Sequence, residues 1–401
     1  MHDHVVHATR CYVTYRLHHY QEAWFELFVI RATIMKNIQG GLQAVLAGAI
    51  RLFFPEHGHN LMTAGMSLKL HTGEGSHVWM RLGLIIADEA AEHQLFSCKG
   101  AAGIKPCFLC VNVFNSKYRR DGIAAFDTDD MAMFHHEHDA SKMVLHSRAS
   151  VAAIIAKLSA PMTAAARKEM ETNLGFNYQP DGILHDPYIL NIVHPVEHAI
   201  FDWMHVFFVS GVWNIMVYVL CMALDTFDIK ARDFEQWVSA WNAPKRRKFI
   251  NFSDVFKQKR WASSKEAKHC KCTASEGLCL LQLLAAFMSS IMEGGRSAVE
   301  KAHAKCYLLL THLVELLQRS AREIIDGRLY TAAAQDFLKL YHDLYGESTM
   351  TPKFHSVLHF GAFLQQWGSL PNCFVLERKH RLPKRSCIHA CMHELGHVSI
   401  V

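Results

Sequence analysis

The chain lacks the features that mark several specialised classes of protein. Its first residues, MHDHVVHATRCYVTYRLHHY, contain no apolar core of a secretory signal, so we expect a protein that is not secreted. It has no internal repeat, no low-complexity tract and no strong excess of one charge, with 42 basic and 37 acidic residues. Half of its 401 residues are apolar. This composition argues against wholesale disorder and predicts a large core, with more than one domain.

A dense cysteine framework is also missing. The 12 cysteines are spread over the chain, and we interpret them as reduced thiols of a nuclear or cytoplasmic protein, with one or two pairs that bind metal. One run, residues 206–224, is long and apolar enough for a membrane span. It contains Ser210 and Asn214, however, and Asp225 follows it directly. We therefore predict a buried core helix and no membrane partner.

Histidine, in contrast, is abundant, and its abundance weakens the motifs that it forms. With 28 histidines, about two H-x-x-x-H pairs are expected by chance, and the chain has four. One of them is HELGH at residues 393–397, an H-E-x-x-H pattern that on a helix holds zinc beside a general base. Only VSIV follows it, so a third zinc ligand would have to come from upstream. We interpret the motif as a coincidence and keep a zinc hydrolase as a weak alternative.

A strongly basic segment, residues 244–272, lies between two predicted helices. Aromatic residues are interleaved with its charges, as in segments that grip phosphates and stack on bases. A solvated basic loop has the same composition, and the sequence does not decide between the two. The residues that we assign to DNA binding are Lys245, Arg246, Arg247, Lys248, Lys257, Lys259 and Arg260.

The first of three pieces with clearer chemistry combines an acid with a thiol pair. Asp88 follows a predicted buried strand at residues 82–86, and the ends of core strands are common positions for catalytic groups. Beyond it, Cys107 and Cys110 form the single C-x-x-C of the chain. In a chain with 12 cysteines, the expected number of C-x-x-C motifs by chance is only about a third of one. This motif therefore carries more information than the histidine pairs.

The other two pieces lie far downstream. Asp202 and His205 form a D-x-x-H in FDWMHVFFVSGVWN. In KFHSVLHFGAFLQQWGSLPNCFVLERKH, the side chains of His355 and His359 lie one helical turn apart, and Glu377 follows after a short linker. Taken alone, each feature has a plain structural explanation: a strand-end cap for the aspartate of the first piece, a surface acid for Glu377, and a polar helix face for the paired histidines.

In this order, the three pieces resemble the catalytic region of eukaryotic DDE/D cut-and-paste transposases. The nearest are the CACTA-type and related Kyakuja-like elements, and the catalytic subunit of the V(D)J recombinase is a more distant relative. The resemblance covers roughly residues 80–380 and rests on the order and spacing of the motifs. It implies a nucleotidyltransferase or nuclease that cleaves double-stranded DNA and transfers strands, with room for a homo-oligomer.

The resemblance also implies roles for individual residues. Asp88 resembles the second catalytic aspartate and Glu377 the final acid, while Asp202 and His205 match a D-x-x-H that we expect to order the active site. Phosphodiester cleavage of this kind uses two Mg²⁺ (or Mn²⁺) ions, for which carboxylates are suitable ligands. A structural Zn²⁺ would connect the distant segments, and its implied ligands are Cys107, Cys110, His355 and His359.

The chain departs from this family at its start. Asp3 is the only aspartate before Asp88, and no strand leads to it, so the first catalytic aspartate has no candidate. We therefore expect a chain truncated at the N-terminus, with little or no catalysis. A zinc-stabilised DNA-binding or interaction protein without catalysis is the alternative.

The predicted fold class is α/β with predominantly helical content. It consists of a partial RNase H-like core interrupted by a large all-α insertion. The predicted domains are a partial core at residues 1–115, the helical insertion at 116–350, the last core segment with the final acid at 351–385, and a divergent tail at 386–401.

Overall fold

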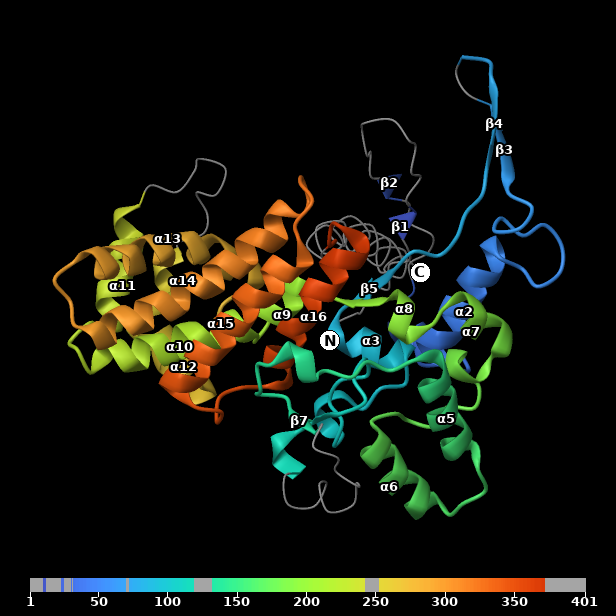
Figure 1. The fold of residues 1–401 in the computed structure, drawn as a ribbon, viewed down its shortest axis with the longest axis horizontal. Helices are drawn as coiled ribbons and strands as arrows, with labels where there is room; N and C mark the ends of the chain where they lie inside the picture. Colours follow the sequence, from blue (N-terminus) through green and yellow to red (C-terminus); the bar gives the residue numbers. More distant parts are fainter. Residues whose placement is uncertain are drawn as a thin grey trace, which may run out of the picture. The chain divides into compact units, whose positions relative to one another are not determined.

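The computed structural model describes residues 10–11, 23–24, 30, 32–69, 72–118, 132–241 and 252–371. The fold is mostly helical with few short strands, which fits the predicted class at that coarse level (Figure 1). Contacts divide the chain into two compact units. Unit 1 comprises residues 1–103, 146–200 and 372–401, and unit 2 comprises residues 104–145 and 201–371. The predicted domain boundaries at 115/116 and 350/351 both fall inside unit 2.

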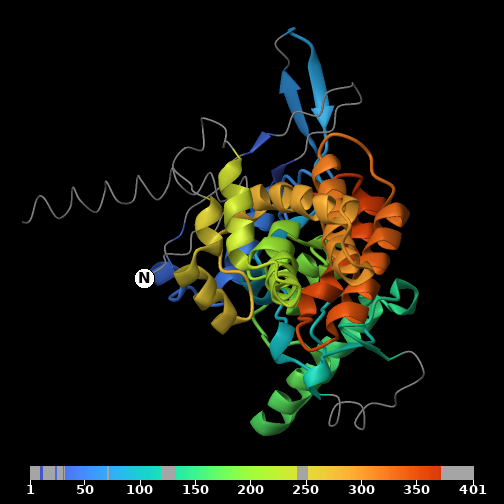
Figure 2. The same ribbon diagram turned by 90° about the vertical axis from the view of Figure 1, so that its left-hand side faces the viewer.

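Unit 1 combines short helices with two-stranded sheets. Its strands pair as β1 (Arg10–Cys11) with β2 (Ala23–Trp24), β3 (Met66–Lys69) with β4 (Gly75–Val78), and β5 (Ile85–Ala87) with β8 (Ala199–Phe201), whose last residue begins unit 2. Figure 2 shows β3 and β4 as a two-stranded antiparallel ribbon. The helices are α1 (Ala32–Met35), α2 (Gly41–Phe53), α3 (Glu89–Leu95), α5 (Arg148–Ser159), α6 (Ala164–Leu174), α7 (Pro187–Ile192) and α8 (Pro195–His198), with single 3-10 turns at Gly100–Ala102 and Ile183–His185.

A buried glutamine links three segments of unit 1. Gln43 in α2 is 2% exposed. Its amide nitrogen donates to Gln94 O at 2.7 Å and its amide oxygen accepts from Ile183 N at 2.8 Å. Buried backbone groups need hydrogen-bond partners, so this side chain holds α2 against the end of α3 and against the turn before α7.

Unit 2 is built around long helices. Two short strands, β6 (Val113–Phe114) and β7 (Met133–Phe134), pair in parallel at its start. The helices are α9 (Trp203–Phe208), α10 (Val212–Asp225), α11 (Ala231–Ala240), α12 (Gln258–Ala267), α13 (Ala274–Glu293), α14 (Ala298–Arg319), α15 (Gly327–Tyr345) and α16 (Pro352–Trp367), with 3-10 turns at Ser116–Tyr118, Ala140–Lys142 and Phe252–Phe256. From α13 to α16, each helix packs against the next along the chain, and Figures 1 and 2 show these helices side by side.

Helix α10 forms the centre of the unit 2 core. Trp213 is fully buried, and its indole N–H donates to the hydroxyl of Tyr307 in α14 at 3.0 Å. That hydroxyl donates in turn to Leu281 O in α13 at 3.1 Å. Each polar group in this series of hydrogen bonds has a partner. The three apolar helices can therefore pack closely without leaving a buried donor unsatisfied.

Two apolar stretches of unit 2 are long enough to cross a membrane by length and composition. They are Trp203–Asp225 and Ala274–Glu293, and 72% and 39% of their most apolar windows are buried inside the structure. The first is interrupted at Ser210, where the backbone has a φ of 46° and separates α9 from α10. Core helices of soluble proteins pass the same test, and the burial of the first stretch favours the predicted core helix.

Two glycines allow α15 and α16 to cross at very short range. A Cβ atom on Gly327 would lie far inside van der Waals contact with the carbonyl oxygen of Gly361. A Cβ atom on Gly361 would overlap the side chain of Thr331 and the carbonyl oxygen of Gly327. Since backbone atoms form this contact, no side chain can rotate away to make room, and the crossing fixes the position of α16.

We predict that Gly327→Ala destabilises the protein by about 1–3 kcal/mol, because the added methyl group overpacks the crossing. The control is Gly48→Ala in α2, where a Cβ atom would meet no atom within 4 Å. That change removes backbone freedom from the unfolded chain and is expected to stabilise by about 0.5–1 kcal/mol. Equilibrium unfolding in denaturant measures both, and equal effects of the two changes would contradict the proposed crossing.

Candidate metal centre

The C-x-x-C lies in a folded-back loop between the 3-10 turn at Gly100–Ala102 and β6. The amide of Val111 donates to Val144 O at 2.8 Å, and the amide of Asn115 donates to Ile104 O at 2.7 Å. These bonds close the loop on both sides of the motif. Cys107 and Cys110 are consequently 6% and 0% exposed.

The histidine pair lies on α16. Thr351 precedes this helix and Pro352 occupies its first turn, where its missing N–H costs no hydrogen bond. His355 and His359 follow at a spacing of one turn, each 1% exposed, so they share one buried face. The alternative explanation of the pair as no more than a polar helix face is therefore not favoured, because both imidazoles are buried in the core.

The four side chains form one cluster inside unit 2. Sγ of Cys107 lies 3.4 Å from Nε2 of His359, and Sγ of Cys110 lies 3.4 Å from Nε2 of both histidines. The two Nε2 atoms are 3.0 Å apart, and all four ligand atoms lie within 4.8 Å of one another. The predicted Cys₂His₂ group is thus present, and it could hold a structural metal such as zinc.

Four of the six separations between ligand atoms are close to those around a tetrahedral zinc ion. With Zn–S near 2.3 Å and Zn–N near 2.0 Å, tetrahedral angles place sulfur and nitrogen about 3.5 Å apart and the two nitrogens about 3.3 Å apart. The observed separations of 3.4 and 3.0 Å are close to these values. Among the described residues, Nδ1 of His355 has no hydrogen-bond partner, so the polar contacts of this ring are all on its Nε2 side. Two thiols and two imidazoles that converge in a buried site are the donor set of a closed structural zinc site.

Electrostatics point the same way. Burial raises the pKa of the Cys107 thiol, but the hydrogen bond from Cys110 and the charge of His359 outweigh it and bring the pKa well below its usual value. Burial and the neighbouring Cys107 raise the pKa of Cys110. Burial lowers the pKa of His355, which keeps this imidazole neutral, as a metal ligand must be. A divalent cation at this place would stabilise the thiolate form of both cysteines.

Two aromatic residues, Phe201 and Phe108, form a shell on one side of the cluster, and the buried side chain of His135 connects two backbone segments on another side. Phe201 lies edge-on to His359 at 5.4 Å and to Phe108 at 5.5 Å. On another side, Nδ1 of His135 accepts from Ser116 N at 3.3 Å, so its Nε2 carries the proton that it donates to Met350 O at 2.9 Å. This buried ring joins the segment after β6 to the residues directly before α16, while the aromatic rings keep water from the ligands.

The D-x-x-H lies beside this shell, because Asp202 follows Phe201 directly. Asp202 is 2% exposed and is the N-cap of α9, where it accepts from Met204 N at 3.1 Å and from His205 N at 3.3 Å. It also pairs with Nδ1 of His205. From α16, Lys353 donates to His205 O at 3.3 Å and to Val209 O at 2.8 Å. The motif therefore fixes the start of α9 and its orientation toward the helix of the histidine pair.

Asp88, one of the predicted catalytic acids, is not a member of this cluster. Asp88 follows a strand, as predicted, but this strand, β5, spans only Ile85–Ala87 instead of residues 82–86. Asp88 belongs to unit 1. It is exposed and is the N-cap of α3, where Oδ1 accepts from Ala91 N at 2.7 Å. Glu377 lies outside the described residues, as does HELGH at residues 393–397. The proposed grouping of the two acids stays a prediction.

Of the predicted DNA-binding residues, some are described by the structure and others lie outside the described residues. Lys257 and Lys259 are exposed, and Lys257 pairs with Asp254 at 2.5 Å. Arg260 is partly buried and forms a bidentate ion pair with Glu276 at 2.8–3.0 Å. Contact of these residues with DNA stays a prediction. Outside the described residues lie Lys245, Arg246, Arg247 and Lys248.

Three residues that support the cluster carried no signal in the sequence. Phe201 and Lys353 are ordinary core and surface residue types, and their contacts bridge long separations along the chain. His135 lies in FHHEH, a histidine-rich stretch in which no spacing singles out one ring. What distinguishes His135 from its neighbours is its buried position with hydrogen bonds on both ring nitrogens, and this is visible only in the fold.

We predict that the purified chain binds about one equivalent of zinc. Cys107→Ser or His359→Ala should remove it, because the three ligands that remain do not complete a closed four-ligand site. Loss of the ion leaves buried polar groups unpaired and should lower the free energy of unfolding by about 3 kcal/mol or more. Metal content by mass spectrometry and unfolding with and without a chelator measure the two effects. His393→Ala is the control: it should keep the zinc, and zinc lost through this change alone would favour the hydrolase motif.

Comparisons with known proteins add no family to this description. A scan against protein-family models finds none that matches the chain, and a search of curated proteins finds no significant match. The functional interpretation therefore depends on the residues themselves and, above all, on the buried Cys₂His₂ cluster.

Proposed function

We propose that the chain is a DDE/D transposase-like protein, with an RNase H-like catalytic region interrupted by a helical insertion. Its activity would be Mg²⁺- or Mn²⁺-dependent cleavage of double-stranded DNA and strand transfer, in the nucleus. The proposal is supported by the motif order of the sequence and by the Cys₂His₂ cluster. The cluster is the observation that carries it.

The cluster supports the proposal because of what it joins. Cys110 and His355 are separated by 245 residues, yet their ligand atoms lie 3.4 Å apart. The C-x-x-C follows Asp88 in the sequence and the histidine pair precedes Glu377. A zinc ion at this place would hold together the two ends of an insertion, which is the role that the resemblance implies for it.

The carboxylates would act on the DNA. In the proposed enzyme, Asp88 and Glu377 hold the divalent cations, which activate the attacking oxygen and stabilise the leaving one. One oxygen of Asp88 accepts a hydrogen bond in the cap of α3, and the side chain is exposed. Asp202 and His205 act as positioning residues through the start of α9.

A zinc-stabilised DNA-binding or interaction protein without catalysis is the second candidate. The specific observation in its favour is that both described acids already have structural roles. Asp88 caps α3, and Asp202 caps α9 and pairs with His205. Neither role requires a catalytic cation.

Asp88→Asn separates the two candidates. Asparagine caps a helix about as well as aspartate, so α3 is retained while the negative charge is removed. For a transposase-like enzyme, we expect the rate of plasmid nicking in Mn²⁺ to fall at least tenfold, roughly the loss that follows when metal sites are perturbed, and Glu377→Gln to have a similar effect. Zinc content and thermal stability should stay unchanged.

Asp326→Asn is the matched control, because Asp326 is another exposed aspartate that caps a helix, α15. It should leave nicking unchanged. Nicking that survives both Asp88→Asn and Glu377→Gln would overturn the assignment of the acids. DNA binding without any nicking by the unaltered chain would favour the second candidate.

We further predict that DNA binding weakens steeply with salt and depends on the basic segment. Replacing Lys245, Arg246, Arg247 and Lys248 by glutamine should reduce the slope of log affinity against log salt by about one for each phosphate that the segment neutralises. Fluorescence anisotropy with a labelled duplex measures it. The control is Lys142→Gln in unit 2, whose ammonium pairs with Glu137 at 3.5 Å, and an equal reduction there would argue for general charge alone.

A further inference from the structure

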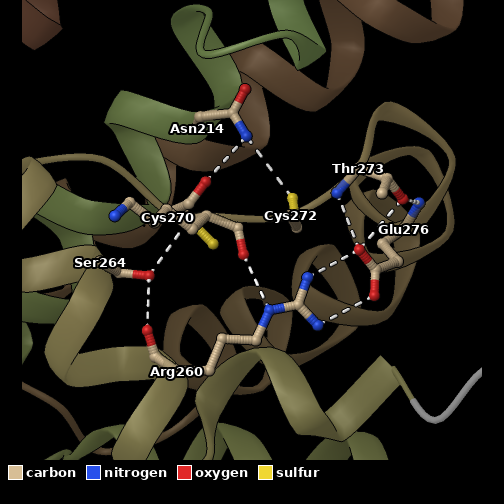
Figure 3. Close-up of polar contacts among 8 residues, drawn as sticks. Asn214, Arg260, Ser264, Cys270, Cys272, Thr273 and Glu276 are labelled. Carbon is tan, nitrogen blue, oxygen red and sulfur yellow. Dashed lines mark hydrogen bonds and ion pairs between the residues drawn. The ribbon is translucent and has the colours of Figure 1, made fainter. Parts of the chain in front are cut away.

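A second pair of cysteines lies in the loop between α12 and α13 (Figure 3). Lys268, with a φ of 54°, is the C-cap that ends α12, and Thr273 is the N-cap that precedes α13. Between them, Cys270 is fully buried and Cys272 is partly exposed. A hydrogen bond with Cys272, together with burial, raises the pKa of Cys270 well above its usual value. Only Lys271 separates the two cysteines, and Figure 3 shows both side chains in this loop.

One side of the loop is held by a buried asparagine. Asn214 in α10 is 1% exposed, and its amide nitrogen donates to Cys270 O at 3.0 Å and to Sγ of Cys272 at 3.5 Å. Its backbone oxygen accepts from Cys270 N at 2.8 Å. Figure 3 shows this side chain over the loop, with both contacts drawn. The buried thiol and its partner are therefore held in a fixed relation to α10.

The other side of the loop is held by an arginine and a serine. Arg260 donates from Nε to Lys271 O at 3.0 Å, and its terminal nitrogens bind both oxygens of Glu276. Oγ of Ser264 accepts from Lys271 N at 3.0 Å. Glu276 raises the pKa of Arg260 most, and the two cysteines raise it further. The guanidinium thus lies against the backbone of Lys271, the residue between the two cysteines.

The remaining described cysteines differ from this pair. Cys221 and Cys306 are buried, and burial raises the pKa of each thiol, which makes them unreactive. Among the described cysteines from Cys98 onward, Cys279 is the only one besides Cys272 that is partly exposed. The pair in the loop therefore combines one accessible sulfur with one protected neighbour, as in a reactive cysteine beside a resolving cysteine.

A metal ion fits this pair less well. A structural zinc site needs four ligands, and among the described residues the Cys107, Cys110, His355 and His359 group is the only set of three or more donors close enough to share an ion. Within that same part of the chain, the loop pair is accompanied by no third donor. Two neighbouring thiols without further ligands are suited to disulfide chemistry instead.

We propose that Cys270 and Cys272 form a redox-active dithiol that a peroxide oxidises to a disulfide. The sulfur of Cys272 attacks one peroxide oxygen, the O–O bond breaks, and an alcohol (water from hydrogen peroxide) leaves as the sulfenic acid forms. The sulfur of Cys270 then attacks that of Cys272, forms the S–S bond and displaces the hydroxyl group, which leaves as water with the Cys270 proton. Two electrons pass from the sulfurs to the peroxide, and a thiol reductant reverses the change. This modification is independent of the proposed DNA chemistry.

The sequence supplies a direct readout. Lys271 separates the two cysteines, so trypsin cuts between them after denaturation, and a disulfide leaves two peptides that separate only on reduction. The zinc-loaded full chain is treated with hydrogen peroxide, blocked with an alkylating agent, digested and analysed by mass spectrometry. We expect the linked peptides, with Cys272 modified at least tenfold faster than Cys279, a factor of the order that the local environment of a thiol commonly produces.

Two variants separate the roles of the sulfurs. With Cys270→Ser, the sulfenic acid on Cys272 should accumulate and be trapped by a cyclic 1,3-diketone, whereas with Cys272→Ser, Cys270 should stay reduced. Cys279→Ser is the control and should still give the linked peptides.

Three outcomes would overturn the proposal. The first is equal oxidation of Cys272 and Cys279, and the second is oxidation of Cys272 to sulfinic acid without linked peptides in the unaltered chain. The third is a second zinc equivalent that disappears with Cys272→Ser. The result on the unaltered chain decides the matter even if a variant fails to fold.

Discussion

The convergence of two thiols and two imidazoles inside unit 2 is the constraint on which the functional interpretation depends. These groups are buried almost completely, and without a cation their desolvation is poorly compensated, since each unsatisfied buried polar group costs about 1–3 kcal/mol. A bound ion removes this cost and links segments 245 residues apart. The entropy of closing so long a loop grows only slowly with its length, so a single ion can offset it. Metal binding at this cluster would therefore be coupled to the folding of unit 2.

The geometry of the cluster depends in turn on helix packing. Helix α16 carries two ligands, and the close crossing at Gly327 and Gly361 fixes its position against α15. Lys353 joins the same helix to the end of α9, and His135 holds the residues before its first turn. A shift of α16 would therefore move both imidazoles together, because the supporting contacts lie along one helix.

Local spacing explains which parts of the molecule could be predicted from the sequence. C-x-x-C and H-x-x-x-H bring the two members of each pair together through local backbone geometry. The choice of His355 and His359 among the four histidine pairs came from the resemblance, through the order of the motifs along the chain. The strand before Asp88 and the helical middle of the chain follow from apolar patterns, which are also local. Phe201 and the Gly327–Gly361 crossing could not be predicted, because their contacts arise only when distant segments pack. The polar network around Cys270 and Cys272 was missed because Asn214 and Arg260 reach the loop from other helices.

The position of Asp88 at a helix N-terminus affects how well this carboxylate could bind a catalytic cation. A helix N-terminus carries partial positive charge, which favours a carboxylate cap and disfavours a cation nearby. Asp88 caps a helix of seven residues, and the field of its first turn acts on any ion that its other oxygen would bind. A second carboxylate close to that ion would compensate for this repulsion, whereas Asp88 alone would not. The catalytic proposal therefore requires Glu377 or another acid beside Asp88, while the Cys₂His₂ cluster, whose four donors are thiols and imidazoles, needs no such partner to bind its ion.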